Sequence, residues 1–173
     1  MRVPRRLQRG ALYHVTVRAN RREMIFNSDE VKRLFIMVLE RASRKFTFRV
    51  DNFCIMGNHV HLLILPESGT SLSRLMQWIL SVFAMAYNKK YGLTGHVWGE
   101  RFFSRIVDSL RSFIKIFLYI DDNPVSARLV SDRRSWEFGG LWHHRTGNVD
   151  VCGKPLEIIR FLFPEHAQLR LSF

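Results

Sequence analysis

The segment from Asn58 to Pro66 constrains the fold of this chain more than any other, because its residues NHVHLLILP alternate as they would in a β-strand. Successive side chains of a strand point to opposite faces of the sheet. One face would carry His59, His61, Leu63 and Leu65, and the other Val60, Leu62 and Ile64. Side chains two positions apart are separated by roughly 6.5 Å at the backbone, so the two imidazoles would project together from a rigid sheet.

Three further strands are predicted around this segment. One runs from Thr47 to Met56, and Gly57-Asn58 supplies a tight turn into the histidine strand, so the two would form an antiparallel hairpin. Another is expected from Ala11 to Arg18, where apolar and polar residues also alternate. The last is expected within Val97 to Asp108.

Two segments show the three- and four-residue spacing of apolar residues that is typical of amphipathic helices. The first begins at Asp29, after a capping Ser28 or Asn27, and runs to about Lys45. The second begins at Thr70 or Ser71 and ends near Gly92. The order strand, helix, strand, strand, helix, strand predicts an α+β domain. Its architecture would be a ferredoxin-like split βαβ sandwich, an antiparallel sheet with helices on one face.

Extra helices are expected after this unit. A third helix is predicted from about Ser109 to Asp122, and Asn123-Pro124 would cap and begin another short helix through about Val130. Tyr119 and Asn123 are four residues apart, so they would project together beside the buried face of the third helix. A last apolar helix is expected near Leu156 to Phe163.

The chain is strongly basic, with 27 Lys and Arg against 15 Asp and Glu. The resulting net charge of +12 favours a polyanionic partner, and nucleic acid is the usual one. Trp98, Phe102 and Phe103 would stack on unpaired bases, or they would fill the core. Phosphate contacts are expected from arginines in the N-terminal arm, near the first strand and beside these aromatic residues: Arg5, Arg6, Arg9, Arg18, Arg21, Arg22, Arg101 and Arg105.

Composition argues against several other classes of protein. The two cysteines, Cys54 and Cys152, form neither a disulfide framework nor a zinc motif, which favours a reducing compartment. No run of residues approaches the length of a membrane span, and no signal-peptide core follows the basic start. We therefore expect a cytoplasmic protein without a membrane partner. It would be a single domain over residues 1–173, with a core from about 9 to 130 and an extension from about 131 to 173.

The paired histidines, one tyrosine and one amide allow a specific chemistry. His59 and His61 would hold a divalent ion that withdraws charge from a phosphodiester, and Asn123 would supply a third ligand. Tyr119 would attack the phosphorus, because a tyrosyl oxygen is both a nucleophile and a good leaving group. Each residue also has an ordinary explanation: histidines at the rim of a core, a tyrosine at the core edge, and an asparagine that caps a helix.

Other polar residues receive lesser roles. His14 is predicted to be a face residue without a catalytic role. Four further histidines lack the paired spacing and are predicted to be structural: His96, His143, His144 and His166. Other possible ligands or bases are single carboxylates: Glu67, Glu100, Asp121 and Asp122. A Gly-rich phosphate loop and a nucleophile-elbow serine are missing from the sequence.

Three ordered blocks of sequence resemble a known family. Asn58-His59-Val60-His61-Leu62-Leu63 is similar to the HUH motif of the single-tyrosine transposases that act on single-stranded DNA. The blocks from Gly95 to Phe102 and from Tyr119 to Val125 resemble further blocks of the REP-associated branch of that family, in the same order and at similar spacing. The resemblance covers roughly Arg9 to Val130, and three ordered blocks are more specific than one motif.

The resemblance implies a ferredoxin-like nuclease domain that uses Mg²⁺ or Mn²⁺ to cleave single-stranded DNA near a hairpin. It implies that Tyr119 is the nucleophile, which forms a 5′-phosphotyrosine link and frees a 3′-hydroxyl. His59 and His61 would be metal ligands. The REP-associated branch places Asn before Pro at this point, which implies Asn123 as the third ligand.

The chain also departs from the family pattern. Gly57 stands where proline is common, and Ser126-Ala127-Arg128 replaces a more usual Lys-Ala-Gly, which puts the DNA preference in doubt more than the chemistry. The resemblance leaves both a monomer and a homodimer with exchanged tyrosines open. A non-catalytic nucleic-acid-binding module on a similar fold is the competing interpretation.

Overall fold

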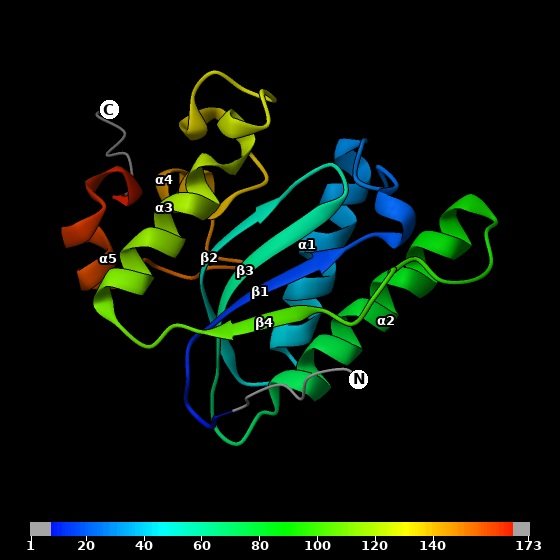
Figure 1. Cartoon of the computed structure of the whole chain (residues 1–173), viewed down its shortest axis with the longest axis horizontal. Helices are drawn as coiled ribbons and strands as arrows, with labels where there is room; N and C mark the ends of the chain where they lie inside the picture. The colour runs from blue at the N-terminus through cyan, green and yellow to red at the C-terminus, as the bar shows by residue number, and fades with distance from the viewer. Residues whose placement is uncertain (1–7, 168–173) are drawn as a thin grey trace.

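The structure is a computed structural model that describes residues 8–167 (Figure 1). It contains one four-stranded sheet with the order β2-β3-β1-β4. The strands are β1 (Tyr13–Arg18), β2 (Phe48–Ile55), β3 (His59–Pro66) and β4 (Phe103–Ile106), and all neighbours are antiparallel. This arrangement confirms the predicted α+β, ferredoxin-like split βαβ sandwich.

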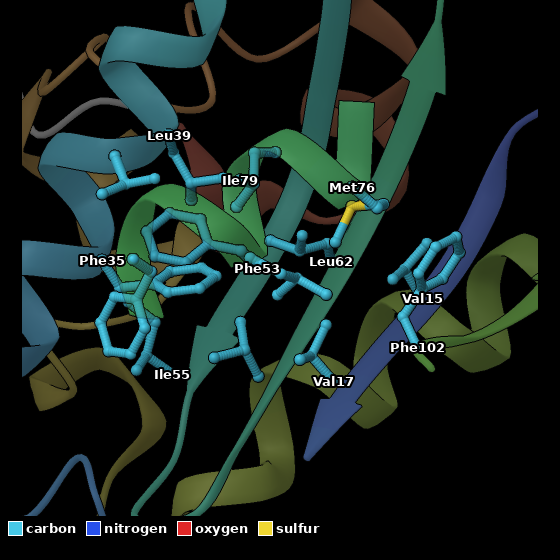
Figure 2. Packing of buried hydrophobic residues seen from close by; sticks show 14 of the residues in the cluster. Val15, Val17, Phe35, Leu39, Phe53, Ile55, Leu62, Met76, Ile79 and Phe102 are labelled. Carbon is cyan, nitrogen blue, oxygen red and sulfur yellow. The ribbon is translucent and has the colours of Figure 1, made fainter. Parts of the chain in front are cut away.

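Helices α1 (Asp29–Ser43) and α2 (Leu72–Tyr91) contact each other beside one face of the sheet, as predicted (Figure 1). The hydroxyl of Ser28 caps α1 by accepting a hydrogen bond from the Val31 N–H at 3.3 Å. The apolar face of β3 enters the core between the sheet and these helices. Figure 2 shows residues that fill this core: Val15, Val17, Phe35, Leu39, Phe53, Ile55, Leu62, Met76, Ile79 and Phe102.

The opposite face of the sheet is covered in part by α3 (Leu110–Ser126) and α5 (Glu157–Leu162). A second apolar cluster joins them to β2 and β3, and within it the rings of Phe117 and Phe163 stack with centroids 4.2 Å apart. Helix α4 (Gly140–Thr146) packs against β2. A Cβ atom on Gly140 would lie 2.3 Å from Asn52 Oδ1, so this close approach requires glycine.

The predicted break of α3 at Asn123-Pro124 is wrong, because the helix continues to Ser126. Ser109 is the N-cap, and Asn123 lies inside the helix, where its amide nitrogen donates to the Tyr119 carbonyl at 2.5 Å. Pro124 removes one N–H from the helix, but later bonds keep the last turn, such as Ala127 N–H to the Asn123 carbonyl. Tyr119 and Asn123 therefore lie on one continuous rigid element.

The connections between these elements are short 3₁₀ helices and loops. The 3₁₀ helices are η1 (Asn20–Arg22), η2 (Arg133–Ser135) and η3 (Pro164–His166). Among residues 8–167, none of the helices has the length and apolar character that crossing a bilayer requires.

Candidate active site

Strands β1 and β3 build the centre of the site. Their register places Thr16 opposite His61 and Arg18 opposite His59. The Nδ1 atom of His61 lies 3.0 Å from His14 Nε2 and 3.2 Å from Thr16 Oγ1, and only 3% of His61 is exposed. The polar side chains of β1 thus fix the imidazole that the alternation of β3 presents on the same face.

The two histidines of β3 lie side by side, as the sequence predicted. Their ring centroids are 4.9 Å apart and the ring planes are nearly perpendicular, at 89°. His59 Nδ1 lies 2.7 Å from Asn58 Oδ1, an acceptor, so Nδ1 carries the proton and Nε2 keeps its lone pair. His61 Nδ1 is likewise occupied by its β1 neighbours, whereas its Nε2 is buried without a hydrogen-bond partner. An unpartnered buried nitrogen is costly unless a ligand satisfies it.

The electrostatics of the site keep these imidazoles neutral. Burial lowers the pKa of His59 to about 4, and the nearby Arg18 charge contributes. Burial lowers the pKa of His61 to about 3, with smaller contributions from His59, His14 and Arg18. The pKa of His14 is also lowered, first by burial and then by Arg105. At neutral pH all three rings are therefore in the form that binds metal ions.

Tyr119 approaches the histidines from α3. Its ring centroid lies 5.3 Å from that of His61 and 6.1 Å from that of His14, in both cases edge-on. Tyr119 is 51% exposed. A phenol that is half exposed and adjacent to a neutral imidazole pair is accessible to a substrate, which a tyrosine in the apolar interior would not be.

A cleft of about 770 Å³ opens beside these residues, on the sheet face opposite α1 and α2. It contains His14, Thr16, His61 and Tyr119 together with an exposed aromatic side chain, Phe103. The remaining walls are rich in positive charge from Arg18, Arg21, Arg22 and Arg101. Glu100 is the one carboxylate among the lining residues. Such a surface favours an anionic polymer with unpaired bases.

The basic loop after β1 is held in an unusual conformation. Arg21 and Arg22 have φ angles of 49° and 59°, a region that favours glycine and costs about 1–3 kcal/mol for other residues. Backbone hydrogen bonds hold this loop, from Ala19 N–H to the Asn58 carbonyl and from Asn20 N–H to the Val97 carbonyl. The Asn58 amide also donates to the Arg22 carbonyl at 3.2 Å. The same Asn58 therefore orients His59 and supports the arginine loop.

The predicted arginines fall into three groups. Arg18, Arg21, Arg22 and Arg101 line the cleft. Arg105 is exposed on β4 opposite His14, and Arg9 is exposed ahead of β1. Arg5 and Arg6 lie outside the described residues.

Most of the other possible ligands lie elsewhere. Glu67 pairs with Arg49, and Asp122 pairs with Arg133. Asp121 is buried and accepts hydrogen bonds from Asn52 and His166. Among residues 8–167 no group of three or more His, Cys, Asp or Glu side chains is placed to hold a metal ion. Asn123, which the sequence predicts as the third ligand, donates its amide nitrogen to the Tyr119 carbonyl, and its Oδ1 is not used in that bond.

Sequence reasoning missed His14 and Thr16. The structure places His14 within hydrogen-bonding distance of His61 and edge-on to Tyr119, although the sequence predicted a face residue without a catalytic role. A signal was present, because His14, Thr16 and Arg18 form the polar face of β1. In a ferredoxin-like sheet β1 is the neighbour of β3, so that polar face must adjoin the histidine pair.

Comparisons with known proteins agree with this fold. The family model described as "Transposase IS200 like" matches residues 8–123. A solved structure of a REP-associated tyrosine transposase bound to a REP hairpin matches with a TM-score of 0.70 and 20% identity, over 91% of this chain and 94% of the other. A candidate transposase from Deinococcus radiodurans matches with a TM-score of 0.50 and 16% identity, over 70% of this chain and 97% of the other. A search of the curated proteins gives no match.

Proposed function

Because the chain belongs to the family of IS200-like transposases, we propose that it cleaves and rejoins single-stranded DNA near a hairpin, through a covalent link to Tyr119. One observation carries the proposal. The half-exposed Tyr119 ring lies beside His61, whose Nε2 atom is buried without a hydrogen-bond partner, in a cleft lined by arginines. This combination of a nucleophile, a neutral ligand atom and phosphate-binding charge is what phosphodiester transfer requires.

The residues of the site fit a divalent ion, Mg²⁺ or Mn²⁺. The unpartnered Nε2 of His61, the neutral His59 ring and the amide oxygen of Asn123 would hold it. When bound, the ion would act as a Lewis acid on the scissile phosphate. His14 and Thr16 hold the Nδ1 side of His61, and Asn58 holds the Nδ1 side of His59, so the chain fixes which nitrogen is available.

Tyr119 would then exchange one phosphodiester for another. Its phenolic oxygen would attack the phosphorus and form a 5′-phosphotyrosine bond, while the bond to the 3′ oxygen breaks. The phenol loses its proton and the departing oxygen gains one, which leaves a 3′-hydroxyl. In the reverse step a 3′-hydroxyl would attack the phosphotyrosine and release Tyr119. Bond number is conserved, so no nucleotide cofactor is required.

The surroundings of Tyr119 suit a single strand. Arginines of the cleft would contact the backbone phosphates, and Phe103, which is 63% exposed, offers a ring on which an unpaired base would stack. The structurally similar REP-associated transposase is bound to a REP hairpin, which supports a hairpin-bearing substrate here. The resemblance allows both a monomer and a homodimer, and light scattering of the DNA complex would distinguish them.

Adduct formation tests the proposed function. The protein is incubated with Mn²⁺ and labelled single-stranded oligonucleotides that carry hairpins, and covalent products are separated under denaturing conditions. We expect adducts with the wild type and with Tyr91→Phe, a control in which another exposed tyrosine is changed, but none with Tyr119→Phe. Binding without adducts on any of these substrates would instead support the non-catalytic nucleic-acid-binding module.

A further inference from the structure

A second cavity, of about 520 Å³, lies between α2 and the segment that leads into β4. Glu100 and Arg101 line both this cavity and the catalytic cleft, so the two spaces adjoin at these residues. The cleft lies on the sheet face opposite α1 and α2, whereas the second cavity lies beside α2. Strand β4 is at the edge of the sheet, so a ligand that occupied both cavities would extend around this edge.

The walls of the second cavity are rigid and aromatic. The Trp98 indole N–H donates to the Leu80 carbonyl of α2 at 2.9 Å, and the Trp98 ring contacts Phe83 with centroids 5.2 Å apart. Phe102 is buried and belongs to the main core. The volume is typical of a small-molecule site, and a fixed aromatic wall suits a flat ring.

Polar groups complete the cavity. Gln77 and Ser81 contribute from α2, and Glu100 and Arg101 from the opposite wall. An amide, a hydroxyl and a carboxylate around an apolar floor are the groups that hydrogen-bond to the edge of an unpaired base.

Two successive aromatic residues connect the cavity with the cleft. Phe102 lines the second cavity, and Phe103 lines the catalytic cleft. Neighbouring side chains in extended chain point to opposite faces, so these two rings serve the two spaces on either side of the sheet edge. A DNA strand with a phosphate on Arg101 would have nucleotides within reach of both the second cavity and the catalytic cleft.

We propose that the second cavity binds one unpaired nucleobase of the same DNA strand that occupies the catalytic cleft, with the strand passing around the edge of the sheet at Arg101. The inference rests on the proposed function for the identity of the ligand. It adds a site of base recognition outside the catalytic cleft, lined by Trp98, Gln77 and Glu100. Sequence preference at one nucleotide position would depend on this cavity.

An abasic scan tests the inference. Tyr119→Phe protein is used so that no cleavage occurs, and binding is measured by fluorescence anisotropy on hairpin oligonucleotides that each lack one base outside the duplex. We expect one position whose base removal weakens binding by about tenfold or more, as loss of one stacked base would. At the other unpaired positions, apart from any base that stacks on Phe103, the effect should be smaller.

A variant that fills the cavity locates the effect. Ser81 is exposed on α2, so Ser81→Trp would block the cavity without disturbing the core. When Ser81→Trp is added to Tyr119→Phe, binding of the intact oligonucleotide should become as weak as the binding of the sensitive abasic oligonucleotide by Tyr119→Phe alone. The difference in affinity between the intact and the abasic oligonucleotide should then disappear. Ser43→Trp, the same change at an exposed serine of α1, is the matched control and should keep the difference. Thermal unfolding verifies that both variants are folded, and Gln77→Trp, a second change that fills the cavity from an exposed position, replaces Ser81→Trp if that variant is not.

The outcomes separate this inference from the proposed function. A flat abasic scan, or a sensitive position that persists in the cavity variants, overturns the nucleobase site even if the wild type forms adducts. A sensitive position that disappears in the cavity variants supports the site even if the wild type forms no adducts, in which case the nuclease proposal fails.

Discussion

The protein contains two clusters of histidines that differ in what surrounds them. His14, His59 and His61 lie on the sheet, where His14 and His61 line the cleft with Tyr119. His143, His144 and His166 lie in the C-terminal region, and each is at most 2% exposed. Burial lowers the pKa of His59, His61, His143 and His144 alike, so a depressed pKa does not distinguish the clusters.

The C-terminal cluster is organised around a buried carboxylate. His166 Nε2 lies 2.9 Å from Asp121 Oδ2, and its Nδ1 lies 2.7 Å from His144 Nδ1. The other oxygen of Asp121 accepts from the Asn52 amide at 2.9 Å. This chain of contacts joins η3 and α4 to α3 and β2. Since Asp121 lies between Tyr119 and Asn123, the cluster braces the helix that carries both.

Unsatisfied nitrogens occur in both clusters, so they do not define a catalytic site by themselves. His61 Nε2, His143 Nδ1 and His144 Nε2 are all buried without hydrogen-bond partners. The sheet cluster differs in having a phenol and a basic cleft beside it. The comparison teaches that chemistry depends on access and on a nearby nucleophile, whereas an enclosed cluster with a carboxylate contributes stability.

The largest expected effect separates the clusters by activity. His61→Ala should reduce the rate of adduct formation more than about a hundredfold, because it removes a proposed metal ligand. Removal of a residue that only orients such a ligand costs about 10–100-fold. The free energy of unfolding should also fall, because His61 is buried and its Nδ1 contacts His14 and Thr16, so the adduct rate is compared per folded molecule. Adduct rates and urea unfolding measure the two quantities. Cleavage at the wild-type rate would contradict the assignment of His61.

The next effect separates them by stability. His166→Ala should lower the free energy of unfolding by about 2–4 kcal/mol, because Asp121 stays buried and loses a partner. Cleavage per folded molecule should fall less than in His61→Ala. Urea unfolding gives the stability, with His96→Ala as the exposed control, for which a change below about 0.5 kcal/mol is expected. Equal free energies of unfolding for His166→Ala and His96→Ala would contradict a stabilising role of the C-terminal histidine cluster.

A smaller effect is expected at His14, which contacts His61 and is predicted to act through it. His14→Ala should weaken Mn²⁺ binding by about tenfold to a hundredfold, because the orientation of His61 loses one of its two supports. His14→Gln, which retains a hydrogen-bonding group, should recover part of the loss. Electron paramagnetic resonance of free Mn²⁺ measures both affinities. Unchanged affinity in His14→Ala would restrict His14 to packing.

The smallest effect concerns pH. His59 and His61 have pKa values of about 4 and about 3 in the folded protein, below the usual value of 6.5. Between pH 6.5 and the folded pKa values, these histidines bind protons in the unfolded chain but not in the folded one. Their contribution to the free energy of unfolding is therefore complete above about pH 6.5 and decreases as the pH falls.

Both histidine clusters contribute to the loss of stability at low pH, and Mn²⁺ distinguishes their contributions. The ion should raise the melting temperature of the wild type at pH 7, with a smaller increase at pH 5, where protons compete for the ligands. In His61→Ala the increase should be lost at both pH values. Differential scanning fluorimetry measures it, and an equal increase in both proteins would place metal binding elsewhere.

The sequence predicted the local parts of the site well. Alternation in β3 placed His59 and His61 on one face, and helical spacing placed Tyr119 and Asn123 together on α3. These relations hold within one element, where backbone geometry alone decides them.

Two contacts between distant elements were not predicted. His14 and His61 are 47 residues apart, and their contact depends on the register of β1 with β3. His166 and Asp121 are 45 residues apart, and their contact depends on how the C-terminal region docks. At Gly57 a Cβ atom would lie 2.3 Å from the terminal methyl of Met24, but Met24 is a flexible side chain that is 51% exposed and can move. Packing therefore does not explain glycine where the resemblance leads one to expect proline.

Mapping the covalent adduct tests the central claim most directly. Wild-type protein is trapped with a hairpin oligonucleotide and Mn²⁺, digested with protease and nuclease, and analysed by tandem mass spectrometry. The chain has four tyrosines, of which Tyr13 is 2% exposed and Tyr91 and Tyr119 are about half exposed. The account predicts a nucleotide linked through its 5′ phosphate to Tyr119, whereas a modification at Tyr91, or a link through a 3′ phosphate, would contradict it.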